Sequence, residues 1–269
     1  MSTGTDDTPP LPSPPESVRG VCPSERLPLL EEYAQRLATD GVVRGLIGPR
    51  EVPRIWDRHV ANSAILATVI PDGVTVCDIG SGAGLPGLVV AIVRPDLRVT
   101  LVEPLLRRTT FLDEVVEALG LENVEVIRGR ADALHGERTF DLVTSRAVAP
   151  LDRLLEWSMP LVAPEGELLA LKGSSIVEEI ESARSVLKKY RCDEPTVIEL
   201  GGGVLESPTH AVRVSWADPS ALPLHLIRGR GAKDAGSKAA GPKSSSSKSA
   251  GPKSEGSAGA GSKKARRRR

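Results

Sequence analysis

The segment at residues 76–87 constrains the fold of this chain most strongly. Its sequence is Val-Cys-Asp-Ile-Gly-Ser-Gly-Ala-Gly-Leu-Pro-Gly, and an apolar run continues to about Val93. The first residues suit a buried strand, and the alternate glycines permit a tight turn with positive φ and uncovered backbone N–H groups. We therefore predict a strand, a glycine-rich turn and a helix, with a ligand at the carboxyl end of the strand.

From residue 74 onward, short apolar runs alternate with amphipathic ones. Strands are predicted at residues 74–79, 98–103, 124–128, 140–144, 167–171, 196–200 and 211–216, and further helices at 105–119, 151–161 and 176–190. This alternation favours a parallel sheet with helices on both faces, because parallel neighbours need crossover connections. With right-handed crossovers the result is a doubly wound α/β sheet, mostly parallel, whose last two strands form a C-terminal antiparallel hairpin.

Composition and periodicity divide the chain into four parts. Residues 1–22 are proline-rich and are predicted to be disordered. Residues 23–72 carry apolar side chains at helical spacing and form an N-terminal helical segment packed on the core. Residues 73–217 form the ligand-binding core. Residues 218–269 repeat Gly, Ser, Ala, Lys and Pro and are predicted to be a disordered basic tail.

The charges are divided unevenly along the chain. Lys and Arg together number 35, as do Asp and Glu, so the formal net charge is zero. The tail, however, carries 13 basic and 3 acidic side chains, and residues 1–217 carry 22 basic and 32 acidic ones. A polycationic tail on an acidic body favours an anionic partner such as RNA phosphate, with a purely solubilising tail as the alternative.

Several classes of site are disfavoured. The three cysteines form no CxxC pair and the four histidines are scattered, which argues against a metal site or a disulfide framework. The most apolar stretch is about nine residues long, whereas a membrane-spanning helix needs about 20. The N-terminus lacks the basic and apolar regions of a secretory signal. We therefore expect a soluble cytoplasmic protein without a metal or membrane contact.

Three acidic residues accompany the ends of successive strands: Asp78, Glu103 and Asp132. A dinucleotide fingerprint would need a third glycine where Leu85 stands. A carboxylate two residues before the first glycine instead favours a cationic ligand. Glu103 is placed to accept hydrogen bonds from both ribose hydroxyls, and Asp132 lies where an adenine edge would be. Together these features predict S-adenosylmethionine (AdoMet), with another nucleotide on a generic glycine turn as the alternative.

The sequence resembles the ribosomal RNA small-subunit methyltransferase G family over about residues 25–216. The resemblance is carried by residues 78–87 with Arg94-Pro95, and by Arg58-His59, Leu121-Glu122-Asn123, Ser145-Arg146-Ala147 and Leu171-Lys172-Gly173. It implies the Rossmann-like fold of class I AdoMet-dependent methyltransferases, and methylation of N7 of a guanosine in the 530 loop of 16S rRNA. It also implies AdoMet contacts at Gly80, Leu85, Ala131, Asp132 and Arg146.

The full set of candidate cofactor-binding residues comprises Asp78, Gly80, Gly82, Gly84, Leu85, Glu103, Ala131, Asp132 and Arg146. Guanine N7 has an available lone pair, so methyl transfer requires in-line positioning and no general base. Arg146 and Lys172 close strands beside the ligand crevice, and we expect them to act in catalysis by positioning phosphate, the guanine O6 edge or the AdoMet carboxylate. A structural ion pair is the alternative for each.

The candidate RNA contacts are Arg50, Arg54, His59, Arg107 and Arg108. The alternatives are a buried histidine at position 59 and a solvated basic face at 107–108. The expected partner is 16S rRNA, either free or within the small ribosomal subunit or its assembly intermediate, and the enzyme is expected to be a monomer. Rival functions are a methyltransferase for a small molecule or protein, and a non-catalytic RNA-binding module with a degenerate fold.

Overall fold

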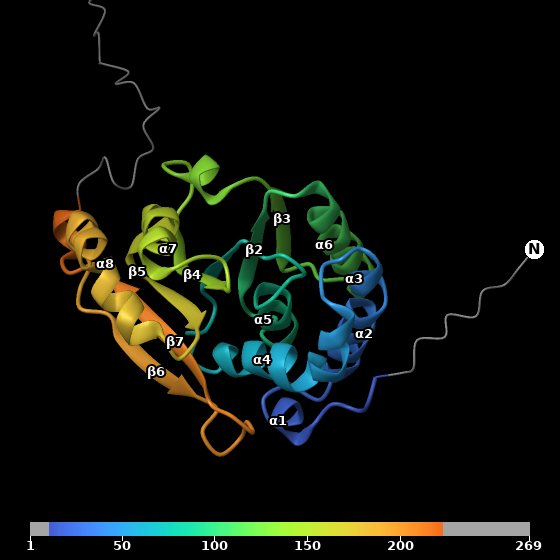
Figure 1. The fold of residues 1–269 in the computed structure, drawn as a ribbon. Coiled ribbons are helices and arrows are strands. Elements are labelled where there is room, and N and C mark those ends of the chain that lie inside the picture. Colours follow the sequence, from blue (N-terminus) through green and yellow to red (C-terminus); the bar gives the residue numbers. More distant parts are fainter. Residues whose placement is uncertain (1–10, 223–269) are drawn as a thin grey trace, which may run out of the picture. The chain divides into compact units, whose positions relative to one another are not determined.

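The computed structural model describes residues 11–222, so the predictions of disorder for residues 1–10 and 223–269 lie outside the described part. Its centre is a sheet with the strand order β3-β2-β1-β4-β5-β7-β6 (Figure 1). The strands are β1 (Thr75–Ile79), β2 (Arg98–Glu103), β3 (Val124–Arg128), β4 (Phe140–Arg146), β5 (Val162–Lys172), β6 (Thr196–Leu200) and β7 (Thr209–Ser215). β1 to β5 pair in parallel, and β7 runs antiparallel to both β5 and β6. The predicted doubly wound, mostly parallel sheet is confirmed.

Helices cover both faces of the sheet. One face carries α2 (Leu27–Ala38), α4 (Asn62–Ala67), α5 (Gly87–Val93) and α6 (Leu106–Leu119), and the other carries α7 (Leu151–Ser158) and α8 (Ile176–Tyr190) (Figure 1). Each layer has its own cluster of buried apolar side chains, and the two clusters meet opposite faces of the central strands. Residues that alternate along β1 therefore belong to different clusters: Val76 faces the first layer and Cys77 the second.

The start of the described chain corrects one prediction. Residues 11–22 were predicted to be disordered, but they contain the short helix α1 (Glu16–Arg19), and Val18 is fully buried. The indole N–H of Trp56 also donates to the carbonyl oxygen of Pro12 at 2.7 Å. Few side chains anchor this segment, but its prolines limit the conformational freedom that ordering removes. Composition alone could not reveal these long-range contacts.

The second half of the predicted N-terminal helical segment has three helical geometries. A 3₁₀ helix at Pro49–Arg54 leads into a π-helix at Ile55–Ala61, and α4 follows. Pro53 has no N–H to donate and its ring obstructs a regular α-helix, so the change of geometry begins beside it. Short π-helical segments occur frequently at functional sites, and this one contains His59.

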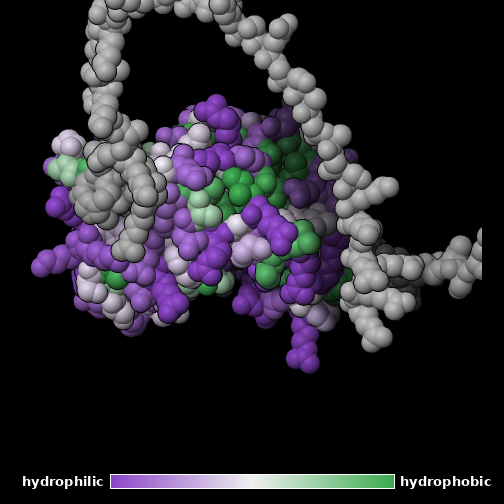
Figure 2. Space-filling model, turned by 90° about the horizontal axis from the view of Figure 1, so that it is seen from above, coloured by the Kyte–Doolittle hydropathy of each residue, from purple (hydrophilic) through white to green (hydrophobic). Residues whose placement is uncertain are grey.

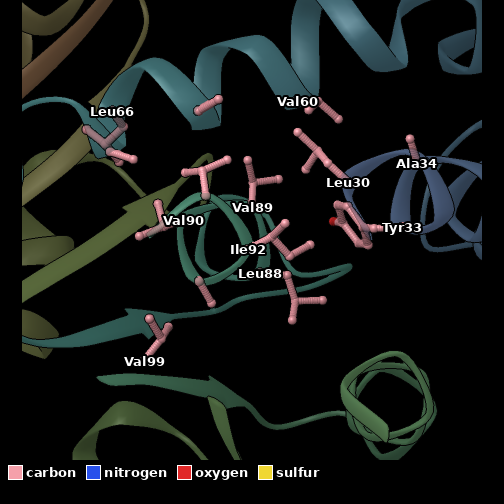
Figure 3. Close-up of a cluster of buried hydrophobic side chains, with 14 of the residues drawn as sticks. Leu30, Tyr33, Ala34, Val60, Leu66, Leu88, Val89, Val90, Ile92 and Val99 are labelled. Carbon is pink, nitrogen blue, oxygen red and sulfur yellow. The ribbon is translucent and has the colours of Figure 1, made fainter. Parts of the chain in front are cut away.

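Helix α5 is apolar on every side and needs cover on every side. All seven of its residues are buried, between the sheet and the N-terminal helices. Figure 3 shows Leu30 and Tyr33 of α2 and Val60 of the π-helix beside the side chains of α5. The hydroxyl of the fully buried Tyr33 donates to the carbonyl oxygen of Ala83 at 3.0 Å. The N-terminal helices therefore share one core with the sheet and hold the glycine-rich turn from behind.

We expect Tyr33→Phe to lower the free energy of unfolding by about 1–2 kcal/mol, because the buried Ala83 carbonyl would lose its donor. Tyr190→Phe is the matched control, since no hydrogen bond joins the Tyr190 hydroxyl to any residue between 11 and 222; its effect should stay within about 0.5 kcal/mol. Urea unfolding of both variants measures the difference. Equal stabilities for the two variants would show that Tyr33 contributes only its ring.

Candidate functional site

A cavity of about 690 Å³ opens at the carboxyl ends of β1, β2, β3 and β4. The strand order reverses between β1 and β4, and ligands of doubly wound sheets bind outside the carboxyl ends of strands at such a switch point. Viewed onto the edge where β2 and β3 end, apolar side chains gather near the middle of the face and hydrophilic ones surround them (Figure 2). The volume lies in the range typical of small-molecule sites.

The glycine-rich turn forms one wall of the cavity. Gly80, Gly82 and Leu85 line it, and both glycines have positive φ, of +69° and +60°. A Cβ atom on Gly80 would lie 2.8 Å from Val148, whereas one on Gly82 would meet nothing nearer than 3.8 Å. The space above Gly82 is therefore open to a ligand. Gly84 does not line the cavity; it faces α5, where a side chain would clash with Leu88.

Asp78 lies behind the turn and does not line the cavity, which corrects the expectation of a direct ligand contact. Its side chain is fully buried, and its Oδ2 accepts the backbone N–H of Gly87 at 3.0 Å. Burial raises the pKa of Asp78 to about 7, and its Oδ1 has no partner among the described residues. Asp78 therefore supports the start of α5. The sequence showed that this carboxylate lies next to the turn, but it did not show whether the side chain faces the cavity or the protein interior.

Glu103 lines the cavity at the end of β2, as predicted, and is only 1% exposed. Its Oε2 accepts the N–H of Gly82 at 3.0 Å and the guanidinium of Arg108 at 3.2 Å, and its Oε1 accepts the N–H of Leu105 at 3.0 Å. A carboxylate oxygen can accept more than one hydrogen bond, so Oε1 keeps capacity for a ligand hydroxyl. Arg108 pairs with this acid beside the cavity instead of standing on a separate basic face.

Arg146 and His59 come together from positions far apart in the sequence. Both line the cavity, and the guanidinium Nη2 of Arg146 contacts Nδ1 of His59. Burial, and then the positive charge of Arg146, lower the pKa of His59 to about 4. The histidine is therefore neutral at pH 7. Position 59 was predicted to be either an RNA contact or a buried histidine. His59 is buried, with 7% exposure, and it also forms part of the cavity wall.

Lys172 does not line the cavity, which corrects its expected role in positioning substrate. Its ammonium pairs with Glu179 of α8 at 2.5 Å and donates to the carbonyl oxygen of Ala149 at 2.9 Å. Glu179 also accepts the N–H of Leu151 at 2.9 Å. Lys172 therefore links α8 to the loop that connects β4 with α7. This matches the alternative prediction of a structural ion pair.

Of the remaining candidates, two line the cavity and three do not. Ala131 and Asp132 line the cavity after β3, and Asp132 also lies 3.5 Å from Arg130. Arg50, Arg54 and Arg107 are exposed and do not line it; within residues 11–222 none of the three forms an ion pair. They stand on the surface, with charges available to a partner.

Some lining residues were not anticipated. Leu46 and Ile47 reach the cavity from the N-terminal segment, and Arg153 and Trp157 reach it from α7. The spacing of four residues between Arg153 and Trp157 places them on the same helix face, which was a usable signal. The sequence did not indicate that this face borders the cavity.

These residues fit AdoMet. The turn leaves bare backbone and open space above Gly82, and Glu103 offers an acceptor for ribose at the end of the next strand. Apolar side chains such as Leu85, Val102 and Leu105 supply the surface that a nucleoside would bury. In the described part of the chain, no group of three or more His, Cys, Asp or Glu side chains could hold a metal ion, and no helix is long and apolar enough to cross a membrane.

Comparison with known proteins agrees with this geometry. The sequence profile of the family described as rRNA small subunit methyltransferase G matches residues 26–203. A protein named ribosomal RNA small subunit methyltransferase G from Nocardioides sp. is 61% identical over 224 residues, which cover 82% of this chain and 90% of that one. Proteins of the same name from Streptomyces avermitilis and Streptomyces coelicolor are 55% and 53% identical over 225 residues, 83% of this chain and 94% of each relative. The chain therefore belongs to the rRNA small subunit methyltransferase G family.

Proposed function

We propose that this chain transfers the methyl group of AdoMet to N7 of a guanosine in the 530 loop of 16S rRNA. The observation that carries the proposal is the cavity at the β1/β4 switch point, where an open glycine turn faces a strand-end carboxylate on a chain of this family. The substrate is 16S rRNA, either free or within the small ribosomal subunit or its assembly intermediate. The enzyme acts as a monomer in the cytoplasm.

The side chains of the cavity suit methyl transfer without proton transfer. AdoMet supplies an electrophilic methyl group on a sulfonium centre. Glu103 would accept the ribose hydroxyls, and Ala131 and Asp132 would border the adenine. Guanine N7 would bond to the methyl carbon through its own lone pair while the S–CH3 bond breaks and the neutral thioether leaves, so no base is needed. Both ring nitrogens of His59 already have partners, which is consistent with a reaction that asks nothing of a histidine base.

Access to N7 restricts the form of the RNA. In an A-form helix N7 faces a deep, narrow major groove that side chains cannot enter, so the target guanosine must be unpaired or displayed by folded RNA. Arg50, Arg54 and Arg107 are placed to contact phosphate outside the cavity, and Arg153 lines the opening itself. The basic tail adds a sequence-independent attraction to the phosphate backbone.

The central experiment is methylation of 30S subunits and of free 16S rRNA with labelled AdoMet, followed by mapping of the modified nucleotide. Labelling at N7 of one guanosine of the 530 loop is the expected result. Efficient labelling of a protein or small molecule, with none of either RNA substrate, would refute the proposal.

Gly82→Leu should weaken AdoMet binding strongly, because the new side chain would enter the open space of the cavity. Gly120→Leu is the matched control: Gly120 has the same φ of +60° at the end of α6, and a Cβ there meets nothing within 4 Å. Both variants carry the strain of a left-handed residue, about 1–2 kcal/mol. Calorimetry should show at least about a tenfold loss of AdoMet affinity for Gly82→Leu alone. Retained affinity in that variant would contradict the assigned site.

Truncation after Leu222 removes all 13 basic side chains of the tail. We expect weaker binding to 30S subunits and a flatter dependence of log affinity on log salt, since fewer counterions are released. AdoMet affinity should be unchanged and serves as the control. If affinity for the subunit and its salt slope both equal those of the full chain, the tail has no part in RNA binding.

A further inference from the structure

The end of the Arg146 side chain is held by the π-helix. Nη1 donates to the carbonyl oxygens of Arg58 and His59 at 3.3 and 3.5 Å, and Nη2 contacts Nδ1 of His59. These partners precede Arg146 by more than eighty residues and belong to the N-terminal helical segment. The guanidinium that stands at the end of β4 is therefore oriented from outside the sheet.

The hydrogen bonds of His59 define one tautomer. Arg146 can only donate, so Nδ1 of His59 must be the acceptor and the ring hydrogen must be on Nε2. Nε2 lies 3.0 Å from Oε2 of Glu51, which accepts that hydrogen. Glu51 is in turn paired with Arg58 at 3.2 Å. Glu51 thus fixes the histidine in the form that can receive the guanidinium.

This arrangement leaves part of Arg146 available to a ligand. A guanidinium has five N–H donors, and the contacts to residues 58 and 59 use its terminal edge. No residue in the range 11–222 accepts a hydrogen bond from Nε of Arg146. The following residue, Ala147, has φ of +54°, a conformation that costs energy for a non-glycine residue and is enriched at functional sites.

We propose that Glu51 and His59 are positioning residues, and that they restrain Arg146 so that N7 of the target guanine stays free to accept the methyl group. The inference rests on the proposed function. An unrestrained arginine commonly donates to both O6 and N7 of guanine. A donor on N7 would occupy the lone pair that must attack the methyl carbon. This clamp, formed by Glu51 and His59, limits Arg146 to acceptors such as guanine O6 or phosphate.

Steady-state methylation of 30S subunits tests the clamp with variants of the full chain. His59→Leu removes the acceptor for Arg146, and we expect kcat to fall at least about tenfold while the KM for the subunit changes less than about threefold. His59→Asn keeps an acceptor near the position of Nδ1 and should recover most of the lost turnover. A purely structural role would be served better by the apolar leucine than by the polar asparagine.

Glu51→Met tests the same interaction from the other partner of His59, because it removes the carboxylate that accepts the Nε2 hydrogen. The Glu51 side chain is 29% exposed, so a methionine of similar size is not expected to disturb folding. Its kcat should fall about threefold or more. Glu32→Met is the matched control, because it alters an exposed pair with Arg36 on α2 away from the cavity; it should keep wild-type kinetics. Wild-type kcat in Glu51→Met and equal kcat in the two His59 variants would overturn the proposal.

Arg146→Lys separates this inference from the proposed function. If Arg146 acts at the site, the lysine variant is slow, and adding His59→Leu to it should lower kcat little further, because both changes remove the same interaction. Fully additive losses would refute the clamp. Normal turnover in Arg146→Lys would instead refute the role of Arg146 itself, and with it the reason for a clamp.

Discussion

The site depends on the hydrogen bonds that hold the backbone of the glycine-rich turn in place. The glycines have no side chains to make such bonds, so the partners come from neighbouring strands and helices. Gly82 donates to Glu103 on the cavity side, and Gly87 donates to Asp78 on the buried side. Tyr33 donates to the carbonyl oxygen of Ala83 from the helical layer. A buried backbone N–H or C=O group without a partner costs free energy. Removing any of these three partners would therefore destabilise the turn by more than the net contribution of a typical hydrogen bond. The turn can then stay bare on the face that meets the ligand.

The same requirement explains why the N-terminal helices belong to the catalytic core. Helix α5 follows the turn and is buried on all sides, so it would be exposed without α2 and α4. Once these helices are present, the π-helix lies next to the end of β4 and can reach Arg146. Cover for an apolar helix and orientation of a cavity residue thus come from one segment.

The sequence predicted most of the fold because strands and helices of this class are specified locally. The apolar runs at β2, β3 and β6 were predicted to the residue. β5 begins five residues earlier than predicted, because Pro164 and Gly166 are disfavoured inside strands, although Val162 already pairs with Phe140 of β4. The position of Glu103 was predicted correctly, because the carboxyl ends of parallel strands all lie at the same edge of the sheet. Lys172 was not, because its partner Glu179 lies on a helix whose packing no local pattern reveals.

Ion pairs within the protein determine which arginines keep an uncompensated positive charge that could attract RNA phosphate. Arg108 is neutralised by Glu103, and Arg94 by Asp72 and Asp96, so neither adds much to the surface potential. Arg50, Arg54 and Arg107 have no such partners within the described residues. Charges act on phosphate mainly within about 8 Å at physiological salt, so the net charge of the body matters less than these few side chains. On an acidic body, unpaired arginines of this kind would supply phosphate contacts that the net charge alone opposes.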